Sequence, residues 1–227
     1  MLVKVTQTFL LTLTLFVGSA MAQSYGVAEL TRLAEAGDAD AQNNLAVVYH
    51  TGQGVPANIN EAVKWYTLAA EQGKANAQLN LGVLHNFGMG VPRDFAKAAQ
   101  WFQLAAEQGE LMAQVSLAGL FLSGRGVETN YVEAAKYYKM AADQGDVGAQ
   151  LALAEMNLSG QGIAQNYDEA ARYYSMAAGH GEVAAQFSMA LMYRDGLGVE
   201  QNDEKAAEYY RLAADQGHIA AMFSMAA

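Results

Sequence analysis

Apolar and polar residues recur along this chain with a period of 36 residues. In the period 74–109, apolar residues at helical spacing predict a first helix, helix A, over 75–87. Residues 88–92 read Gly-Met-Gly-Val-Pro, a turn that ends the helix. A second helix, helix B, is expected to start at Asp94 and run to about Glu107. A fixed period of this length predicts an array of stacked two-helix units.

Three short motifs mark every period. The Ala-Gln pairs begin at Ala41, Ala77, Ala113, Ala149 and Ala185; the aromatic pairs begin at Trp65, Trp101, Tyr137, Tyr173 and Tyr209; the closing glycines are Gly37, Gly73, Gly109, Gly145, Gly181 and Gly217. We therefore expect five full units, at 38–73, 74–109, 110–145, 146–181 and 182–217. A capping helix within 23–37 precedes them, and a partial sixth unit over 218–227 follows.

The start of helix B carries capping residues. Asn or Asp stands there in every unit, as Asn58, Asp94, Asn130, Asn166 and Asn202. Glutamates three residues on, at Glu61, Glu133 and Glu169, predict a capping box in three units. The five Gly-x-Gly loops follow a helix and lack a third glycine, so we interpret them as helix-ending turns and not as dinucleotide sites.

The N-terminus predicts export. Lys4 precedes a mostly apolar run of 12 residues, and the small-residue site Ala20-Met21-Ala22 follows it. This is the layout of a secretory signal peptide over 1–22, and the run is short for a membrane span. After cleavage near Ala22 the mature chain has no membrane span, and we expect it to be periplasmic or secreted by a bacterium.

Composition narrows the possible functions. Lys and Arg number 13 against 23 Asp and Glu, for a net charge of −10, and no basic cluster is present, so nucleic acid is not an expected partner. The chain has no cysteine, no helical His pair and no Ser-x-x-Lys or Gly-x-Ser-x-Gly motif. We therefore assign no catalytic, cofactor-binding or metal-binding residue.

One face of helix A varies between units and is the candidate partner-binding surface. Residues that recur hold a stack together, whereas residues that differ are free to meet a partner. This face, the helix A stripe, comprises Asn43, Val47, His50, Leu79, Val83, Asn86, Val115, Leu122, Leu151, Glu155, Leu158, Phe187, Leu191 and Arg194. Its apolar middle and polar ends are typical of a groove for a protein or peptide. The alternative is that its apolar residues pack on neighbouring helices.

These motifs bring the chain close to a known family. Ala98-Ala99-Gln100-Trp101-Phe102, Ala105-Ala106-Glu107-Gln108-Gly109 and the Gly-x-Gly-Val loop at 124–127 resemble the Sel-one-like repeat (SLR) family. The resemblance covers essentially the whole mature chain. It implies an all-α, tetratricopeptide-like α/α superhelical solenoid whose concave side is lined by helix A, and a role as a non-catalytic adaptor or scaffold of the bacterial envelope.

The resemblance leaves two further functions open. A cysteine-rich subgroup of the family is associated with penicillin binding and β-lactamase activity, which makes an enzyme acting on β-lactams or peptidoglycan one alternative. The other is a secreted factor that binds host proteins. The C-terminal unit has no helix B, so its apolar run over 219–223 would be half covered. This end is a candidate surface for a partner or for self-association.

Overall fold

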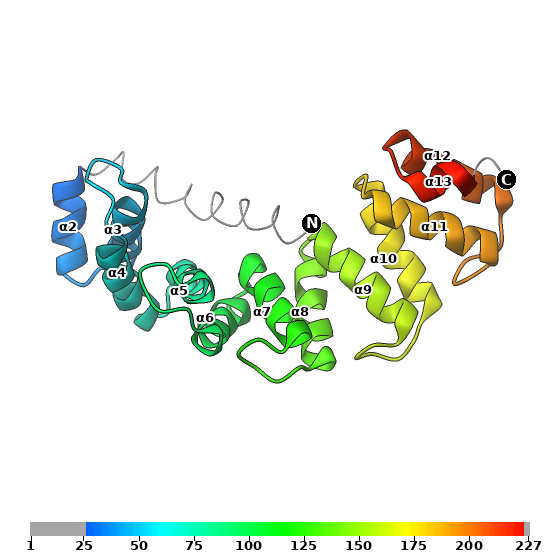
Figure 1. The fold of residues 1–227 in the computed structure, drawn as a ribbon. Coiled ribbons are helices and arrows are strands. Elements are labelled where there is room, and N and C mark those ends of the chain that lie inside the picture. The colour runs from blue at the N-terminus through cyan, green and yellow to red at the C-terminus, as the bar shows by residue number, and fades with distance from the viewer. Residues whose placement is uncertain (1–25, 225–227) are drawn as a thin grey trace. The chain divides into compact units, whose positions relative to one another are not determined.

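The computed structural model describes residues 26–224, and all regular structure in this range is α-helical (Figure 1). The predicted signal peptide and residues 225–227 lie outside the described residues. Each helix between 26 and 224 is too short or too polar to cross a bilayer. The expected all-α architecture of repeated helix pairs is confirmed.

The helices alternate between the two expected types. Helices A are α3 (Ala39–Thr51), α5 (Ala75–Phe87), α7 (Leu111–Ser123), α9 (Val147–Ser159), α11 (Val183–Asp195) and the short α13 (Ile219–Ser224). Helices B are α2 (Val27–Glu35), α4 (Ile59–Glu71), α6 (Phe95–Glu107), α8 (Tyr131–Asp143), α10 (Tyr167–Gly179) and α12 (Asp203–Asp215). Helix α2 lies within the segment expected to hold a capping helix.

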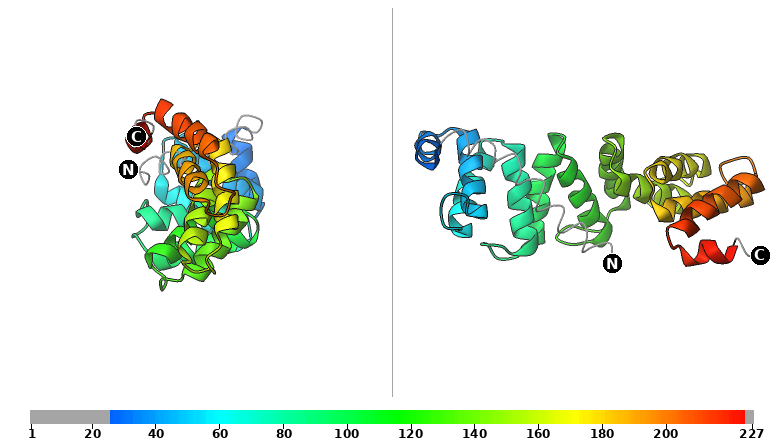
Figure 2. Two further views of the ribbon diagram at one scale, coloured as in Figure 1. Left: turned by 90° about the vertical axis from the view of Figure 1, so that its right-hand side faces the viewer. Right: turned by 90° about the horizontal axis from the view of Figure 1, so that it is seen from above.

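The described chain falls into two compact halves, each made of several repeat units, one ending at Thr129 and the other starting at Asn130. The first holds α2 to α7 and the second holds α8 to α13. Within each half, helices that follow one another along the chain pack side by side, and Figures 1 and 2 both show this arrangement. Each of the helices α3, α5, α9 and α11 is therefore enclosed between two helices B.

The expected N-caps of helix B are present in all five full units. Each Asn or Asp side chain accepts a hydrogen bond from the backbone N–H three residues on, at 2.9–3.2 Å. The capping box is not formed. The backbone N–H of Asn58 donates instead to the carbonyl of Tyr49 in helix A at 2.8 Å, and Glu61 pairs with Lys64. Because this N–H is already bonded across the loop, the glutamate is free to pair with a cation on its own helix.

The Gly-x-Gly loops end helix A as expected. The first glycine is left-handed, as at Gly124 with φ +67°, and caps the helix. The second glycine packs against the helix B of the preceding unit. A Cβ on Gly126 would lie 2.2 Å from the carbonyl carbon of Phe95, and one on Gly198 would lie 2.0 Å from the carbonyl oxygen of Tyr167. These loops therefore bring neighbouring units into backbone contact.

In the first two full units, the two members of each aromatic pair contact different units. Tyr66 and Phe102, the second members, are 0% and 2% exposed and fill the core of their own unit. The first members reach back to the unit before. Trp65 packs against the cluster that contains Leu30, and Trp101 packs against the cluster that contains Tyr66. Both tryptophans are half-buried, so they contribute less to the core than full burial would give.

The Ala-Gln pair recurs because its glutamine joins neighbouring helices. Gln42 Nε2 donates to the carbonyl of Ala34 at 3.1 Å, and Gln42 Oε1 accepts from Gln72 Nε2 at 2.7 Å. Gln78 repeats both bonds, with Ala70 and Gln108. Gln42, Gln78, Ala34 and Ala70 are buried, whereas Gln72 and Gln108 lie at the surface. This glutamine pair therefore holds helix A against two successive helices B.

Candidate interaction surfaces

Part of the helix A stripe lies in the interior. Val47 is 1% exposed and belongs to the core cluster of Ala46, Tyr66 and Leu81, so the expectation that it meets a partner directly is corrected. Leu79 and Val83 are 0% and 6% exposed. The helices α3, α5, α9 and α11 each contact a helix B on either side, and a face that is variable in sequence is partly used for packing.

The rest of the stripe reaches the surface. Leu122, Glu155 and Arg194 are exposed. The half-buried members are Asn43, His50, Asn86, Val115, Leu151, Leu158, Phe187 and Leu191. Partner binding by these residues stays a prediction.

Some stripe residues are tied to their own unit. His50 Nδ1 lies 3.4 Å from the hydroxyl of Tyr66, and burial lowers the pKa of this histidine. At the equivalent place in the last full unit, Arg194 donates to the hydroxyl of Tyr210 at 3.4 Å and pairs with Asp195 at 2.7 Å. The hydrogen bond to Asp195 raises the pKa of the guanidinium. The polar ends of the stripe are thus anchored by the second aromatic residue of helix B.

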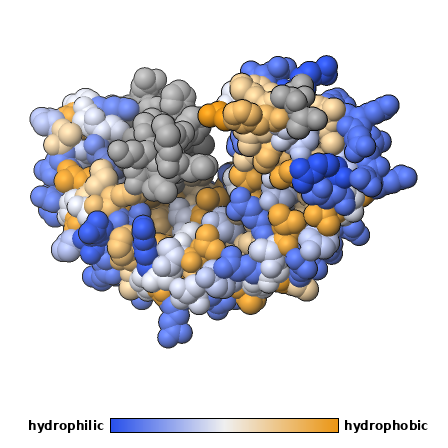
Figure 3. Space-filling model, turned by 45° about the vertical axis from the view of Figure 1, so that its right-hand side comes forward, coloured by the Kyte–Doolittle hydropathy of each residue, from blue (hydrophilic) through white to orange (hydrophobic). Residues whose placement is uncertain are grey.

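The C-terminal helix α13 presents apolar side chains to solvent. Ile219, Met222 and Phe223 are 69%, 48% and 74% exposed, while Ala221 packs on α12. On the face drawn in Figure 3, by comparison, apolar and polar side chains are interspersed. Self-association through the C-terminal end stays a prediction.

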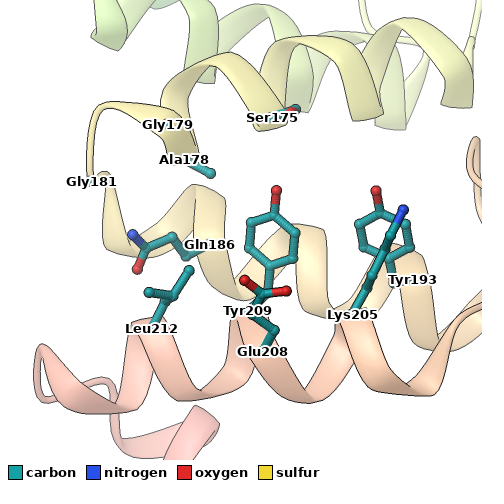
Figure 4. Close-up of a pocket in the computed structure, with 10 residues that line it drawn as sticks. All are labelled: Ser175, Ala178, Gly179, Gly181, Gln186, Tyr193, Lys205, Glu208, Tyr209 and Leu212. Atoms are coloured by element: carbon teal, nitrogen blue, oxygen red, sulfur yellow. The ribbon is translucent and has the colours of Figure 1, made fainter.

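A hollow that the sequence patterns did not indicate lies between α10, α11 and α12 (Figure 4). Its volume is about 650 Å³. Tyr193 of α11 and Tyr209 of α12 stack with ring centroids 5.8 Å apart and 17° between their planes. Both rings extend toward α10, and Lys205 runs beside Tyr193 with its Nζ 5.0 Å from the ring centroid. Glu208 lines the same hollow.

Three departures from the repeat open this hollow. Ser175 replaces the longer side chains of Gln103, Lys139 and Arg211, while the first unit has the short Thr67; Gly179 stands where the other full units have Glu or Asp. The third departure is the absence of a cation over the ring of Tyr209. In α10 the guanidinium of Arg172 lies 4.1 Å from the ring centroid of Tyr173, whereas Glu208 holds that position before Tyr209. Aligning the units at 36-residue spacing would have revealed all three positions.

Among residues 26–224, His, Asp and Glu side chains do not gather in groups of three that could hold a metal ion.

Comparison with known proteins gives the class of this chain. The family model described as "Sel1 repeat" matches at 39–74, 75–110, 111–146, 147–182 and 183–218. Each match begins one residue later than the division used above. The chain belongs to the Sel1 repeat family. Proteins of this family are generally protein-interaction scaffolds.

Two crystal structures resemble the chain over most of its length. One is a protective antigen present in uropathogenic Escherichia coli strains, with an SLR fold, 34% identity and a TM-score of 0.80 over 93% of this chain and 47% of the other. The second is a Sel1 repeat protein from Oxalobacter formigenes, with 31% identity and a TM-score of 0.78 over 92% and 88%. This chain thus spans about half the length of the first. A search of the curated proteins gave no match.

Proposed function

We propose that this chain is an exported, non-catalytic scaffold of the bacterial envelope that binds a protein or peptide through the exposed part of the helix A stripe. The observation that carries the proposal is the variation of the surface positions of the stripe. At one position the five units carry His50, Asn86, Leu122, Leu158 and Arg194, which differ in charge and size, whereas the caps and glycines recur from unit to unit. Positions that recur are used by the stack, which leaves the variable ones to select a partner.

The packing supports a mechanism of rigid presentation. Helix A is held by the glutamine pairs and by the loop glycines, and none of these residues belongs to the stripe. A surface fixed in this way loses little conformational entropy when a partner binds. We expect affinity to come from shape and from apolar contacts, with the exposed charges selecting among partners.

Binding is tested with two matched triple variants of the mature chain. The first changes the stripe, as Leu122→Asp, Glu155→Arg and Arg194→Glu. The control makes the same three kinds of change on exposed positions of helix B, as Leu104→Asp, Glu107→Arg and Arg211→Glu. A partner crosslinked from envelope extract by the parent and by the control, but lost from the stripe variant, supports the proposal. Equal capture by all three folded proteins contradicts it.

Export rests on the pattern of residues 1–22 and agrees with a relative that is described as a protective antigen. Fractionation of cells that express the full chain, or the chain without residues 1–22, tests it. We expect a shortened product in periplasm or medium from the full chain and a cytoplasmic product from the deletion. Retention of the uncleaved full chain in the cytoplasm would remove the envelope part of the proposal.

A further inference from the structure

The hollow between α10, α11 and α12 carries two opposite charges without ion-pair partners. Lys205 and Glu208 both line it, and neither forms an ion pair with another residue between 26 and 224. Lys205 lies along Tyr193, and the stacked ring of Tyr209 stands beside it (Figure 4). The hollow is thus lined by a cation, an anion and two aromatic rings.

The order of the charges on α12 differs from the order on α8 and α10. In α8 and α10 a glutamate precedes the cation by three residues, and the two pair, as Glu133 with Lys136 and Glu169 with Arg172. In α12 the cation comes first, at Lys205, and Glu208 follows. Glutamate N-terminal to the cation is the better orientation on a helix. Arg211 follows Glu208 by three residues, but these two side chains form no ion pair. The reversal places an acid where Arg172 covers Tyr173 in α10, and so removes the cation that would cover Tyr209.

The hollow also has room for a ligand. Ser175 and Gly179 line its α10 side; three of the other full units have a longer side chain than Ser175, and all four have an acidic residue in place of Gly179. Tyr209 is half-buried, as are Trp65 and Trp101 at the same place in the first two units, whereas Tyr137 and Tyr173 are 3% and 4% exposed. The aromatic ring that is covered in α8 and α10 is therefore accessible in α12.

We propose that this hollow binds a zwitterionic ligand, with its carboxylate at Lys205, its cation at Glu208 and an apolar group against Tyr209. A short peptide segment and a free amino acid share this chemistry. A carboxylate and an ammonium ion each form charge-assisted hydrogen bonds with these side chains, and the aromatic floor shields them in part from water. The site uses none of the helix A stripe residues, so it stands or fails independently of the function proposed above.

The test is a titration of the ¹⁵N-labelled mature chain followed by backbone amide NMR. The probes are the blocked tripeptide acetyl-Glu-Leu-Lys-amide, its single-charge analogues with Gln for Glu or for Lys, and free leucine. We expect the amides of Gly179, Gly181 and Gln186 to shift with the tripeptide. Each single-charge analogue should bind roughly tenfold more weakly than the tripeptide, since it leaves either Lys205 or Glu208 without a partner of opposite charge.

The remaining probe separates the two sources of the ligand. Tighter binding of the tripeptide than of leucine supports the proposal and assigns the site to a peptide segment. Tighter binding of leucine supports it and assigns the site to a free amino acid.

Two variants abolish the site without removing core residues. The charge swap Lys205→Glu with Glu208→Lys restores the order found in α8 and α10, and Gly179→Asp restores the residue type of Asp143 and Asp215. Both should stay folded and lose the shifts. The matched control is the opposite swap on α8, Glu133→Lys with Lys136→Glu, which should bind like the parent. Absence of shifts in the parent at millimolar probe, or equal shifts in the folded Lys205/Glu208 swap, would overturn the proposal.

Discussion

At the scale of single residues, one buried acceptor breaks the pattern of glutamine pairs. Gln186 Oε1 accepts a hydrogen bond from Gln216 Nε2 at 2.9 Å, as Gln42 does from Gln72 and Gln78 does from Gln108. In the unit between 147 and 182, His180 takes the place of the donor, and the buried Oε1 of Gln150 has no hydrogen-bond partner. A buried acceptor without a donor costs stability.

Replacing this histidine by glutamine should therefore stabilise the protein. His180→Gln supplies an Nε2 donor at the position that Gln216 holds in the next unit, and we expect the free energy of unfolding to rise by about 1 kcal/mol. Thermal unfolding followed by circular dichroism measures this as a rise of roughly 2–4 °C in Tm. The mirror variant Gln216→His should lower Tm by a similar amount. Unchanged Tm in both would show that the glutamine pairs are energetically neutral.

A second prediction at this scale concerns pH. Burial holds the pKa of His50 below its ordinary value of 6.5, because the imidazolium is poorly solvated beside Tyr66. The unfolded chain therefore binds this proton more readily than the folded chain does. The stability associated with neutral His50 is present above about pH 6.5 and is lost as the pH falls from there through the folded pKa.

Replacing His50 should thus reduce acid sensitivity. His50→Asn introduces the residue found at Asn86 in the next unit. Between about pH 7.5 and about pH 5.5, we expect the variant to lose less Tm than the parent. His180→Asn changes an exposed histidine and serves as the control. An identical loss of Tm in the parent and in His50→Asn would refute the assignment.

At the scale of the elements, the loops after helix A are fixed by backbone contact between units. Gly126→Ala adds a methyl group 2.2 Å from the carbonyl carbon of Phe95 at a φ of +71°, and we expect a loss of about 2–4 kcal/mol in unfolding free energy. Gly109→Ala is the matched control. Its φ is +92°, but nothing lies within 4 Å of the added Cβ, so only the left-handed strain of about 1 kcal/mol applies. Urea unfolding of both variants gives the difference, and equal losses would mean that the contact is unimportant.

The helices themselves could be predicted well from the sequence. Helix A over 75–87 and the cap at Asp94 agree with α5 and α6, because caps, glycines and proline act locally on the residues beside them. The capping box failed for a reason that no local pattern contains. The backbone N–H of Asn58 donates a hydrogen bond to the carbonyl of Tyr49, nine residues earlier, and this bond depends on how the loop folds back on helix A.

The surfaces were harder to predict than the helices. The stripe was chosen by variability, which does not distinguish an exposed residue such as Leu122 from a core residue such as Val47. The hollow was missed because each of its residues is ordinary by itself. What opens it is the combination of a short residue at Ser175, an absent side chain at Gly179 and a reversed charge order on α12.

At the scale of the whole molecule, the repeat predicts tolerance of deletion. Removing residues 147–182 joins equivalent positions and leaves α8 followed by α11, so each remaining helix keeps the type of neighbour it has now. We expect the shortened protein to stay helical and to unfold at a lower temperature, since one interface between units is lost. Circular dichroism per residue should be unchanged. A loss of helical signal beyond the deleted part would show that this unit is indispensable to its neighbours.

The contact between each second loop glycine and the helix B before it also bears on how such a chain changes over generations. The contact spans one unit and no more, so a duplicated or lost segment of 36 residues recreates it at the new junction without any compensating substitution. The length of the array can therefore change in single genetic steps. The protective antigen with 34% identity is about twice as long as this chain, and a difference in length of this kind is what the rule permits.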